Sequence, residues 1–327
     1  MRIAVVGAGA IGGSIAHALA HAGCDPVLVA RGASAAAIAR DGLTVERFGS
    51  SQTSRPRVVE DTRGIEPFDA VIGTLKAQDW AAAVPLIEPL VGPETCLVPA
   101  INGIPWWYFQ HSGGALEGTR LGCLDPDGTL GSAFPTSRIV GGVVYMAATR
   151  VAPGRIDWPT GKRLVLGEVG PVAGARVPAL AAVLRSAGME VDESPDIRHA
   201  IWMKLLGNAG FNSISALADA TVVEILDDPD LRAVCAGTMK ELVEVAAAIG
   251  VDIDVSVDTR LETARRLGEF RTSTLQDFDA GRPLETAALV EAPCEIGRLA
   301  GVPTPVLATL GRLLRRAVAR RDRMKGA

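Results

Sequence analysis

The feature that most limits the fold of this chain is a glycine pattern close to its N-terminus. The segment VVGAGAIGG follows the apolar residues Ile3 and Ala4 and places Gly7, Gly9 and Gly12 in the spacing GxGxxG. Between a strand and a helix, the first glycine permits a tight turn and the second lets the backbone approach a pyrophosphate. The third allows close packing of the helix. The pattern therefore predicts a dinucleotide-binding turn at the start of an α/β domain.

The helix expected after this turn would hold the phosphates. Its first N–H groups have no partner within the helix and lie at the positive end of the helix dipole. Ala10 and Ile11 lie at this start. We therefore include them with Gly7, Gly9 and Gly12 among the cofactor-binding residues. A glycine-rich turn without a ligand is the alternative, and the strand, helix and second strand expected around the turn argue against it.

The hydrophobic pattern divides the chain into two parts. Short β-branched runs and an alanine-rich helical segment in the first part are typical of a parallel sheet with crossover helices. After residue 193, helical periods dominate. The expected strands are 2–6, 26–30, 69–74, 95–100, several between 138 and 166, and 189–192; the expected helices are 10–22, 176–187, 197–217, 229–249, 286–300 and 305–320. We predict an α/β Rossmann-type dinucleotide-binding domain over 1–193 and an all-helical C-terminal domain over 194–327.

Three polar residues follow expected strands, where ligands of such sheets bind. Arg31 ends VLVARG at the position where an NAD site usually carries an acidic residue, and a guanidinium there suits the 2′-phosphate of NADP(H). Lys76 in GTLKAQDW and Asn102 in PAINGIP complete the predicted cofactor site. The alternatives are a surface arginine, a solvated lysine and an ordinary Asn-Gly turn.

A polar seam interrupts the otherwise apolar segment RHAIWMKLLGNAGFNSIS. Lys204, Asn208 and Asn212 are spaced i, i+4 and i+8, so on a helix they form one stripe, with Ser215 close to it and Trp202 on the opposite face. We expect the seam to face a cleft. For the asparagines, a buried hydrogen-bond network between helices remains an alternative, whereas an interior lysine requires a charged partner or water.

Two segments therefore carry candidate substrate residues. A reductase that delivers a hydride to a ketone needs a proton donor, and Lys204 can serve as that acid. The later segment FRTSTLQDFDAGRPLETAALV holds Ser273 and Glu285. Glu285 opens an expected helix, where the dipole alone would stabilise a carboxylate. A helix start that faces a cleft is equally suited to a substrate-binding acid.

These residues together are similar to the ketopantoate reductase (2-dehydropantoate 2-reductase) family over almost the whole chain. The resemblance rests on GAGAIG, the Arg31 strand end, LKA, NGIP, WMKLLGNAGFNSISAL and TSTLQD…GRPLE. It implies NADPH-dependent reduction of 2-dehydropantoate to (R)-pantoate, a step toward coenzyme A. The roles it implies are general acid for Lys204, substrate binding for Glu285, substrate contact for Asn208, Asn212 and Ser273, and a place beside the nicotinamide for Asn102.

Two other functions stay open at this point. One is an NADPH-dependent reductase of another 2-oxo acid or ketone, because Asp79 and Phe270 depart from the family pattern near the substrate segments. The other is an NADPH-binding sensor without turnover. A sensor needs neither Lys204 nor Glu285, so the presence of both favours an enzyme.

Composition limits the partners and the compartment. The net charge of -4 argues against nucleic acid, and no uninterrupted apolar run is long enough for a membrane span. The five cysteines are scattered without a CxxC, which fits a reducing cytoplasm better than disulfides or a metal site. We interpret the basic C-terminal segment RLLRRAVARRDRMKGA as a solvated helix end. A small-molecule 2-oxo acid is the expected partner, and a homodimer is left open.

Overall fold

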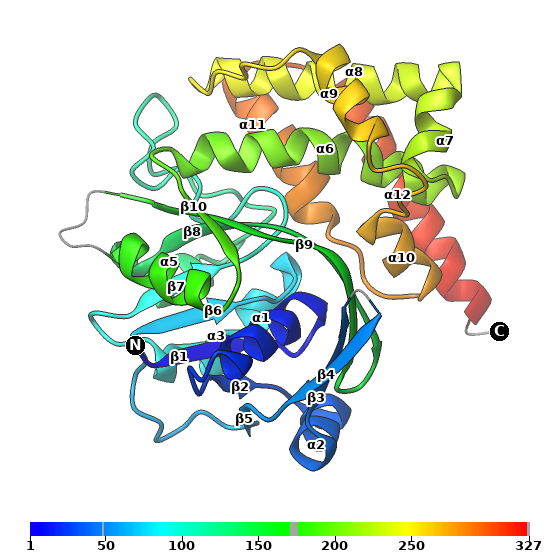
Figure 1. The fold of residues 1–327 in the computed structure, drawn as a ribbon. Coiled ribbons are helices and arrows are strands. Elements are labelled where there is room, and N and C mark those ends of the chain that lie inside the picture. The colour runs from blue at the N-terminus through cyan, green and yellow to red at the C-terminus, as the bar shows by residue number, and fades with distance from the viewer. Residues whose placement is uncertain (48, 171–175, 326–327) are drawn as a thin grey trace. The chain divides into compact units, whose positions relative to one another are not determined.

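The computed structural model describes residues 1–47, 49–170 and 176–325, and the chain forms two compact units (Figure 1). The first unit comprises Met1–Ile101 and Gly128–Ile197, and the second comprises Asn102–Asp127 and Arg198–Ala327. The predicted domain limits, 1–193 and 194–327, stay predictions. A division into compact units does not show which residues form an independently folding domain. The compact units do assign Asn102–Asp127 to the second unit, which the hydrophobic pattern alone did not indicate.

A five-stranded parallel sheet forms the centre of the first unit. Its strand order is β5-β2-β1-β6-β7, which is the order 3-2-1-4-5 along the chain and defines a Rossmann-type fold. The four predicted strands of this sheet are confirmed, whereas β5 was not predicted. The bounds are β1 (Ile3–Val6), β2 (Val27–Val29), β5 (Arg57–Val59), β6 (Ala70–Gly73) and β7 (Cys96–Pro99).

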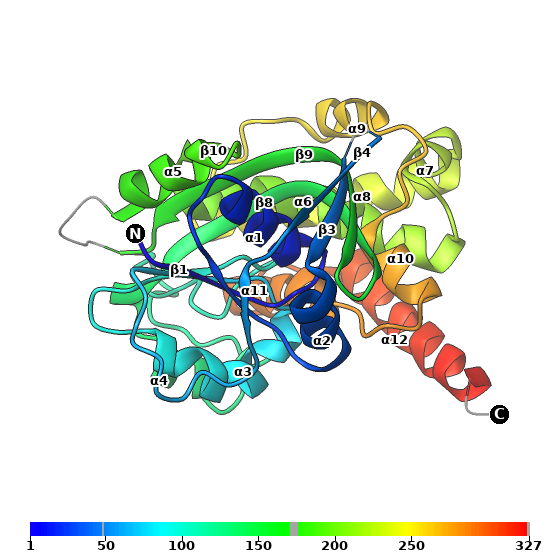
Figure 2. The ribbon, with the colours of Figure 1, turned by 60° about the horizontal axis from the view of Figure 1, so that its bottom comes forward.

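Helix α1 (Ala10–His21) is covered on two sides, which explains why it is so rich in buried small residues. It packs against the parallel sheet and against a second sheet of order β10-β9-β3-β4, to which β8 adds by pairing with β9 (Figure 2). Ile15 and Leu19 of α1 are fully buried in this core. The strands of the second sheet are β3 (Leu43–Arg47), β4 (Ser50–Ser54), β8 (Val140–Ala152), β9 (Arg155–Glu168) and β10 (Glu190–Glu193).

The remaining helices of the first unit are shorter. Trp80 at the start of α3 is fully buried, and its ring lies so close to Gly73 that a Cβ there would be 2.4 Å from it. Glycine at the end of β6 is therefore required for this packing. The helices are α2 (Gly32–Asp41), α3 (Trp80–Ile87), α4 (Thr129–Ala133) and α5 (Arg176–Ser186), with single turns η1 (Ala77–Asp79), η2 (Glu88–Leu90) and η3 (Thr136–Arg138).

The second unit is helical, as predicted, and its described residues contain no strand. The expected helices 197–217, 229–249 and 305–320 are confirmed as α6, α8 and α12. No helix in the described part of the chain combines the length and apolar character needed to cross a membrane. The bounds are α6 (Ile197–Ala218), α7 (Val222–Asp227), α8 (Pro229–Ala248), α9 (Val257–Arg265), α10 (Ser273–Asp279), η4 (Ala287–Glu291), α11 (Ala292–Ala300) and α12 (Pro305–Lys325).

The expected helix 286–300 begins with a π-helical turn, η4, before it continues as α11. Pro293 has no N–H and cannot donate to a carbonyl in the preceding turn. The carbonyl of Ala288 is thereby available to a partner outside the helix, and it accepts a hydrogen bond from the Ile104 amide at 2.9 Å. The irregular turn therefore ties the segment after Asn102 to the segment after Glu285.

Two further contacts hold the second unit together. The indole N–H of Trp202 on α6 donates to the Tyr108 hydroxyl at 2.6 Å, and both side chains are buried. The carboxylate of Glu241 on α8 accepts from the amides of Val306 and Leu307 at 2.7 and 2.9 Å. A carboxylate at a helix N-terminus satisfies amides that lack intrahelical partners, so Glu241 anchors the start of α12.

Candidate active site

The glycine turn has the geometry that its sequence predicts. Gly7 adopts φ +105°, which other residues rarely do, and a Cβ on Gly12 would lie 2.0 Å from the Gly7 carbonyl oxygen. A Cβ on Gly9, in contrast, would meet no heavy atom of the described residues within 4 Å. The first and third glycines are thus required by the fold, whereas the space beside Gly9 is open, as a phosphate-binding backbone needs.

The start of α1 is suited to phosphate. Ala10 and Ile11 form its first turn, Gly9 is its N-cap residue, and no side chain among the described residues caps it. The turn is held by Thr74, whose hydroxyl donates to the carbonyl oxygens of Val6 and Gly7 at 3.1 and 3.2 Å. Thr74 was missed by the sequence analysis. The only signal for it was its place as the last residue of the expected strand 69–74.

Arg31 lies where the sequence predicts, at the carboxyl end of β2, and is the exposed N-cap residue of α2. The next amide, of Gly32, donates to the Glu60 carboxylate at 3.0 Å. Arg150 from β8 donates to the Ser34 hydroxyl in the first turn of α2 at 2.9 Å. The structure therefore places a second arginine, Arg150, at the helix start that follows Arg31, and Arg150 had no local sequence signal.

Lys76 follows β6 and precedes the turn η1, half-buried at a strand end of the parallel sheet. Its predicted position at the edge where the strands end is therefore the observed one. A contact of its side chain with a cofactor remains a prediction.

In the second unit, three polar side chains from distant parts of the sequence form one hydrogen-bonded group. The amine of Lys204 on α6 donates to the Asn102 side-chain oxygen at 2.6 Å. The Asn102 side-chain nitrogen donates to the Glu285 carboxylate at 3.3 Å. The amide orientation is fixed chemically, because an ammonium group can only donate and a carboxylate can only accept. We call these residues the Lys204 group.

The backbone around Asn102 explains how this group is assembled. Gly103 has φ +81°, and a Cβ there would lie 2.3 Å from the Ala288 carbonyl oxygen. The two chain segments approach so closely that only glycine fits, and the Ile104–Ala288 hydrogen bond fixes their register. The Asn-Gly pair is therefore more than an ordinary turn, because it brings the Asn102 amide to Glu285.

The environment of Lys204 changes its acidity. Burial lowers its pKa from the ordinary 10.5 to about 8, because an ammonium group loses hydration there, and the negative charge of Glu285 opposes this shift. An amine with a pKa near 8 is mostly protonated at neutral pH and gives up its proton far more readily than a surface lysine. This is the property that a general acid requires.

The other predicted substrate residues differ in their positions. Asn208 and Asn212 continue the Lys204 face of α6, with Asn208 half-buried and Asn212 7% exposed. Ser273 is exposed at the first residue of α10, where Thr272 provides the cap by accepting from the Leu275 amide. Their contacts with a substrate stay predictions.

Ser215, which lies near the seam in the sequence, has a structural role. Its hydroxyl is buried and donates to the Ala220 carbonyl at 2.6 Å, just beyond the end of α6. Ser215 is thus part of the connection between α6 and α7. It lies near the polar seam in the sequence but has this separate structural role.

Two family models match this chain. Residues 3–171 match the model described as ketopantoate reductase PanE/ApbA, and residues 196–318 match the model for the C-terminal part of ketopantoate reductase PanE/ApbA. The first lies mainly in the α/β unit and the second in the helical unit. Together they cover most of the chain.

Individual relatives agree with the models. A 2-dehydropantoate 2-reductase of Mesorhizobium japonicum is 41% identical, with 98% of this chain and 99% of the relative covered. A solved structure from Ralstonia solanacearum, provisionally assigned as a ketopantoate reductase, is 40% identical with a TM-score of 0.93, covering 98% of each chain. A 2-dehydropantoate 2-reductase structure from Geobacter metallireducens is 31% identical with a TM-score of 0.85, covering 97% of this chain and all of that one. The chain belongs to the ketopantoate reductase family.

Proposed function

We propose that this protein reduces 2-dehydropantoate to (R)-pantoate with NADPH. The observation that carries the proposal is the Lys204 group, in which a half-buried amine of lowered pKa is hydrogen-bonded through Asn102 to a carboxylate. A nucleotide-binding protein without turnover has no need of such a group. The proposed substrate is taken from the names of the relatives, and the proposed reaction chemistry is argued from the residues of this chain.

The first unit fits NADPH. Backbone amides at Ala10 and Ile11, beside the open space at Gly9, would hold the pyrophosphate. Arg31 would pair with the 2′-phosphate through charge-assisted hydrogen bonds. Lys76 would contact the cofactor from the end of β6. When bound, NADPH supplies the hydride for the reduction.

Lys204 is proposed to act as the general acid. Its ammonium group would donate a hydrogen bond to the substrate carbonyl oxygen and stabilise the negative charge that develops there, then transfer the proton to form the product hydroxyl. Asn102 holds the amine in position, and we also propose that it contacts the nicotinamide. Glu285 keeps Lys204 protonated at neutral pH, because its negative charge raises the pKa of the amine.

The remaining polar residues of the second unit are proposed to bind the substrate. Glu285 can accept a hydrogen bond from a substrate hydroxyl. Asn208, Asn212 and Ser273 can donate hydrogen bonds to a carboxylate. These groups match a small 2-oxo acid that carries a hydroxyl, which is the chemistry of 2-dehydropantoate.

We also infer that the protein works in the cytoplasm as a homodimer. All five cysteines are free thiols, and Cys96 and Cys235 are buried, which suits a reducing compartment. A structure with the same fold is described as a dimeric ketopantoate reductase of Staphylococcus aureus. Sedimentation of the purified protein tests the dimer.

The direct test of function is an absorbance assay of the purified protein with NADPH and a panel of 2-oxo acids. We expect 2-dehydropantoate to give the highest kcat/KM. A clear preference for another 2-oxo acid would replace the substrate and keep the reaction type. Tight NADPH binding without turnover of any panel member would contradict the enzyme proposal and favour a sensor.

Replacing Arg31 tests the cofactor assignment. A hydrogen bond to a charged group contributes about 1.5–3 kcal/mol, so Arg31→Ala should weaken NADPH binding by about 10- to 150-fold. NADH lacks the 2′-phosphate, and its dissociation constant should hardly change. Calorimetric titration of both nucleotides makes the measurement, and equal losses for the two would show that Arg31 does not recognise the phosphate.

Replacing Lys204 tests the general acid. Lys204→Ala should lower kcat by about 10²- to 10⁴-fold, the usual contribution of general acid–base catalysis, while NADPH affinity stays unchanged. In the wild type, kcat/KM should fall as the pH rises through about 8, because the amine then loses its proton. The exposed Lys240 provides the matched control, and Lys240→Ala should behave as wild type. A loss below about fivefold for Lys204→Ala, far under the general-acid range, would make Lys204 a structural residue.

Glu285→Gln separates charge from shape. The variant should raise KM for the 2-oxo acid with NADPH binding intact. It should also move the basic limb of the kcat/KM profile to lower pH, because the charge that raises the pKa of Lys204 is gone. A variant that only loses thermal stability, with an unmoved pH profile, would assign Glu285 to the helix start alone.

A further inference from the structure

The basic C-terminal helix contains one arginine that is not solvated. The side chain of Arg321 on α12 is only 11% exposed, although the sequence around it resembles a charged helix end. We propose that Arg321 is a positioning residue for the substrate segment from Ser273 to Glu285. This inference rests on the proposed function, because it concerns the geometry of that same site.

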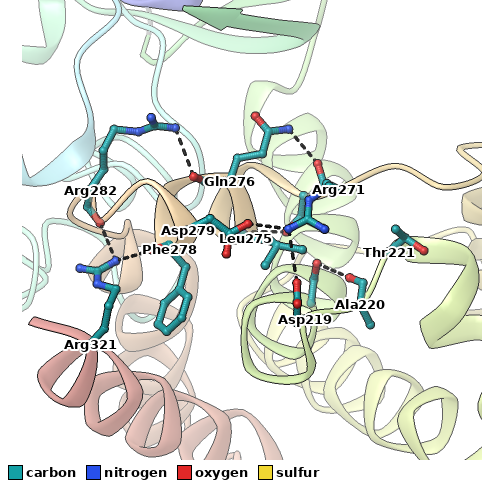
Figure 3. A network of polar contacts seen from close by, with 12 residues as sticks. Asp219, Ala220, Thr221, Arg271, Leu275, Gln276, Phe278, Asp279, Arg282 and Arg321 are labelled. Carbon is teal, nitrogen blue, oxygen red and sulfur yellow. Dashed lines mark hydrogen bonds and ion pairs between the residues drawn. The ribbon is translucent and has the colours of Figure 1, made fainter. Parts of the chain in front are cut away.

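Arg321 contacts the backbone of the substrate segment directly. One terminal nitrogen of its guanidinium, Nη1, donates to the carbonyl oxygens of Phe278 and Arg282, at 3.0 and 3.3 Å (Figure 3). The guanidinium carbon also lies over the Phe278 ring, 5.1 Å from its centre. The two accepting carbonyls bracket the turn that leaves α10, so a single side chain holds both ends of that turn.

The orientation of Arg321 is itself fixed. Its Nε donates to the Asp322 carboxylate at 2.8 Å, and the same carboxylate lies 2.8 Å from Nη2. Nη1 is then directed at the two backbone carbonyls. A planar group with several donors in fixed directions can make these contacts simultaneously, which a lysine amine cannot do in the same way.

Two other arginines, Arg271 and Arg282, also contact residues of α10 near this turn, and both are labelled in Figure 3. The side chain of Arg282 donates to the Asp277 carboxylate at 2.6 Å, and its amide donates to the Asp277 carbonyl at 2.8 Å. Arg271 pairs with Asp279 of α10 and with Asp219, which follows α6. Arg321 differs from both because it reaches the turn from a distant helix.

The segment needs such support because α10 has only 7 residues. A helix that short is not stable by itself, so tertiary contacts must set its position. Ser273 begins this helix and Glu285 follows its exit turn. A guanidinium near the last carbonyls of α10 also complements the negative end of the helix dipole. Loss of Arg321 should therefore loosen both predicted substrate residues together.

The family model for the C-terminal part ends at residue 318, before Arg321. The contact with the substrate segment is thus made by a residue outside the matched range. It gives the basic C-terminal segment a function that neither its composition nor the family assignment supplies.

The test compares Arg321→Ala with Arg320→Ala, which removes the same charge from an exposed neighbour on α12. Displacement of reacting groups by about 1 Å can cost up to about 10²-fold in rate. For Arg321→Ala we expect KM for 2-dehydropantoate to rise by a factor between about 5 and 10². NADPH affinity should be unchanged. Arg320→Ala should match wild type. Arg321→Lys, which keeps the charge, should restore only part of the loss.

Hydrogen exchange of the same variants, measured by mass spectrometry, tests the inference without turnover. Arg321→Ala should speed exchange in the peptide covering 276–286 and leave α6 and α8 unchanged. Equal exchange in the Arg321→Ala and Arg320→Ala proteins would overturn the inference. So would a uniform increase over all helices, which indicates a general structural role. If the wild type reduced no 2-oxo acid, the proposed function would be wrong. The exchange measurement would still show whether Arg321 holds this segment in place.

Discussion

The candidate chemistry of this protein depends on the hydrogen bonds through which Asn102 joins Lys204 to Glu285. These residues come from three segments far apart in sequence, and one amide satisfies both an ammonium donor and a carboxylate acceptor. An amine that loses hydration without a partner is costly. The Asn102 amide and the Glu285 charge offset that cost. They leave the lysine protonated at neutral pH and still ready to release its proton.

The backbone makes this arrangement specific. Pro293 leaves the Ala288 carbonyl available, the Ile104 amide takes it, and Gly103 allows the approach that this requires. π-helical turns are uncommon and often occur at functional sites. Here the turn has a definite task, because it fixes the distance between the Asn102 and Glu285 segments. Backbone hydrogen bonds also fix α12. Glu241 caps the start of this helix, and Arg321 binds the substrate segment near its end.

Features set by local sequence were predictable. The glycine turn follows from spacing and φ requirements, the parallel strands from buried β-branched runs, and the polar seam of α6 from helical periodicity. Features set by long-range pairing were not. Asn102 and Glu285 are 183 residues apart, and nothing local to either indicates the other. The strand SSQTS of β4 is mostly exposed and lacks an apolar pattern, and Arg321 resembles its solvated neighbours in every local respect.

The central claim is that Lys204 has an acidity suited to proton donation, and NMR can measure this directly. The chain has only five lysines, so side-chain labelling with ¹³C at the ε carbon gives a simple spectrum, in which the Lys204→Ala variant identifies the signal. We expect the Lys204 signal to titrate near pH 8, well below the ordinary lysine pKa of 10.5. A Lys204 signal that titrates near the ordinary value of 10.5 would contradict the account.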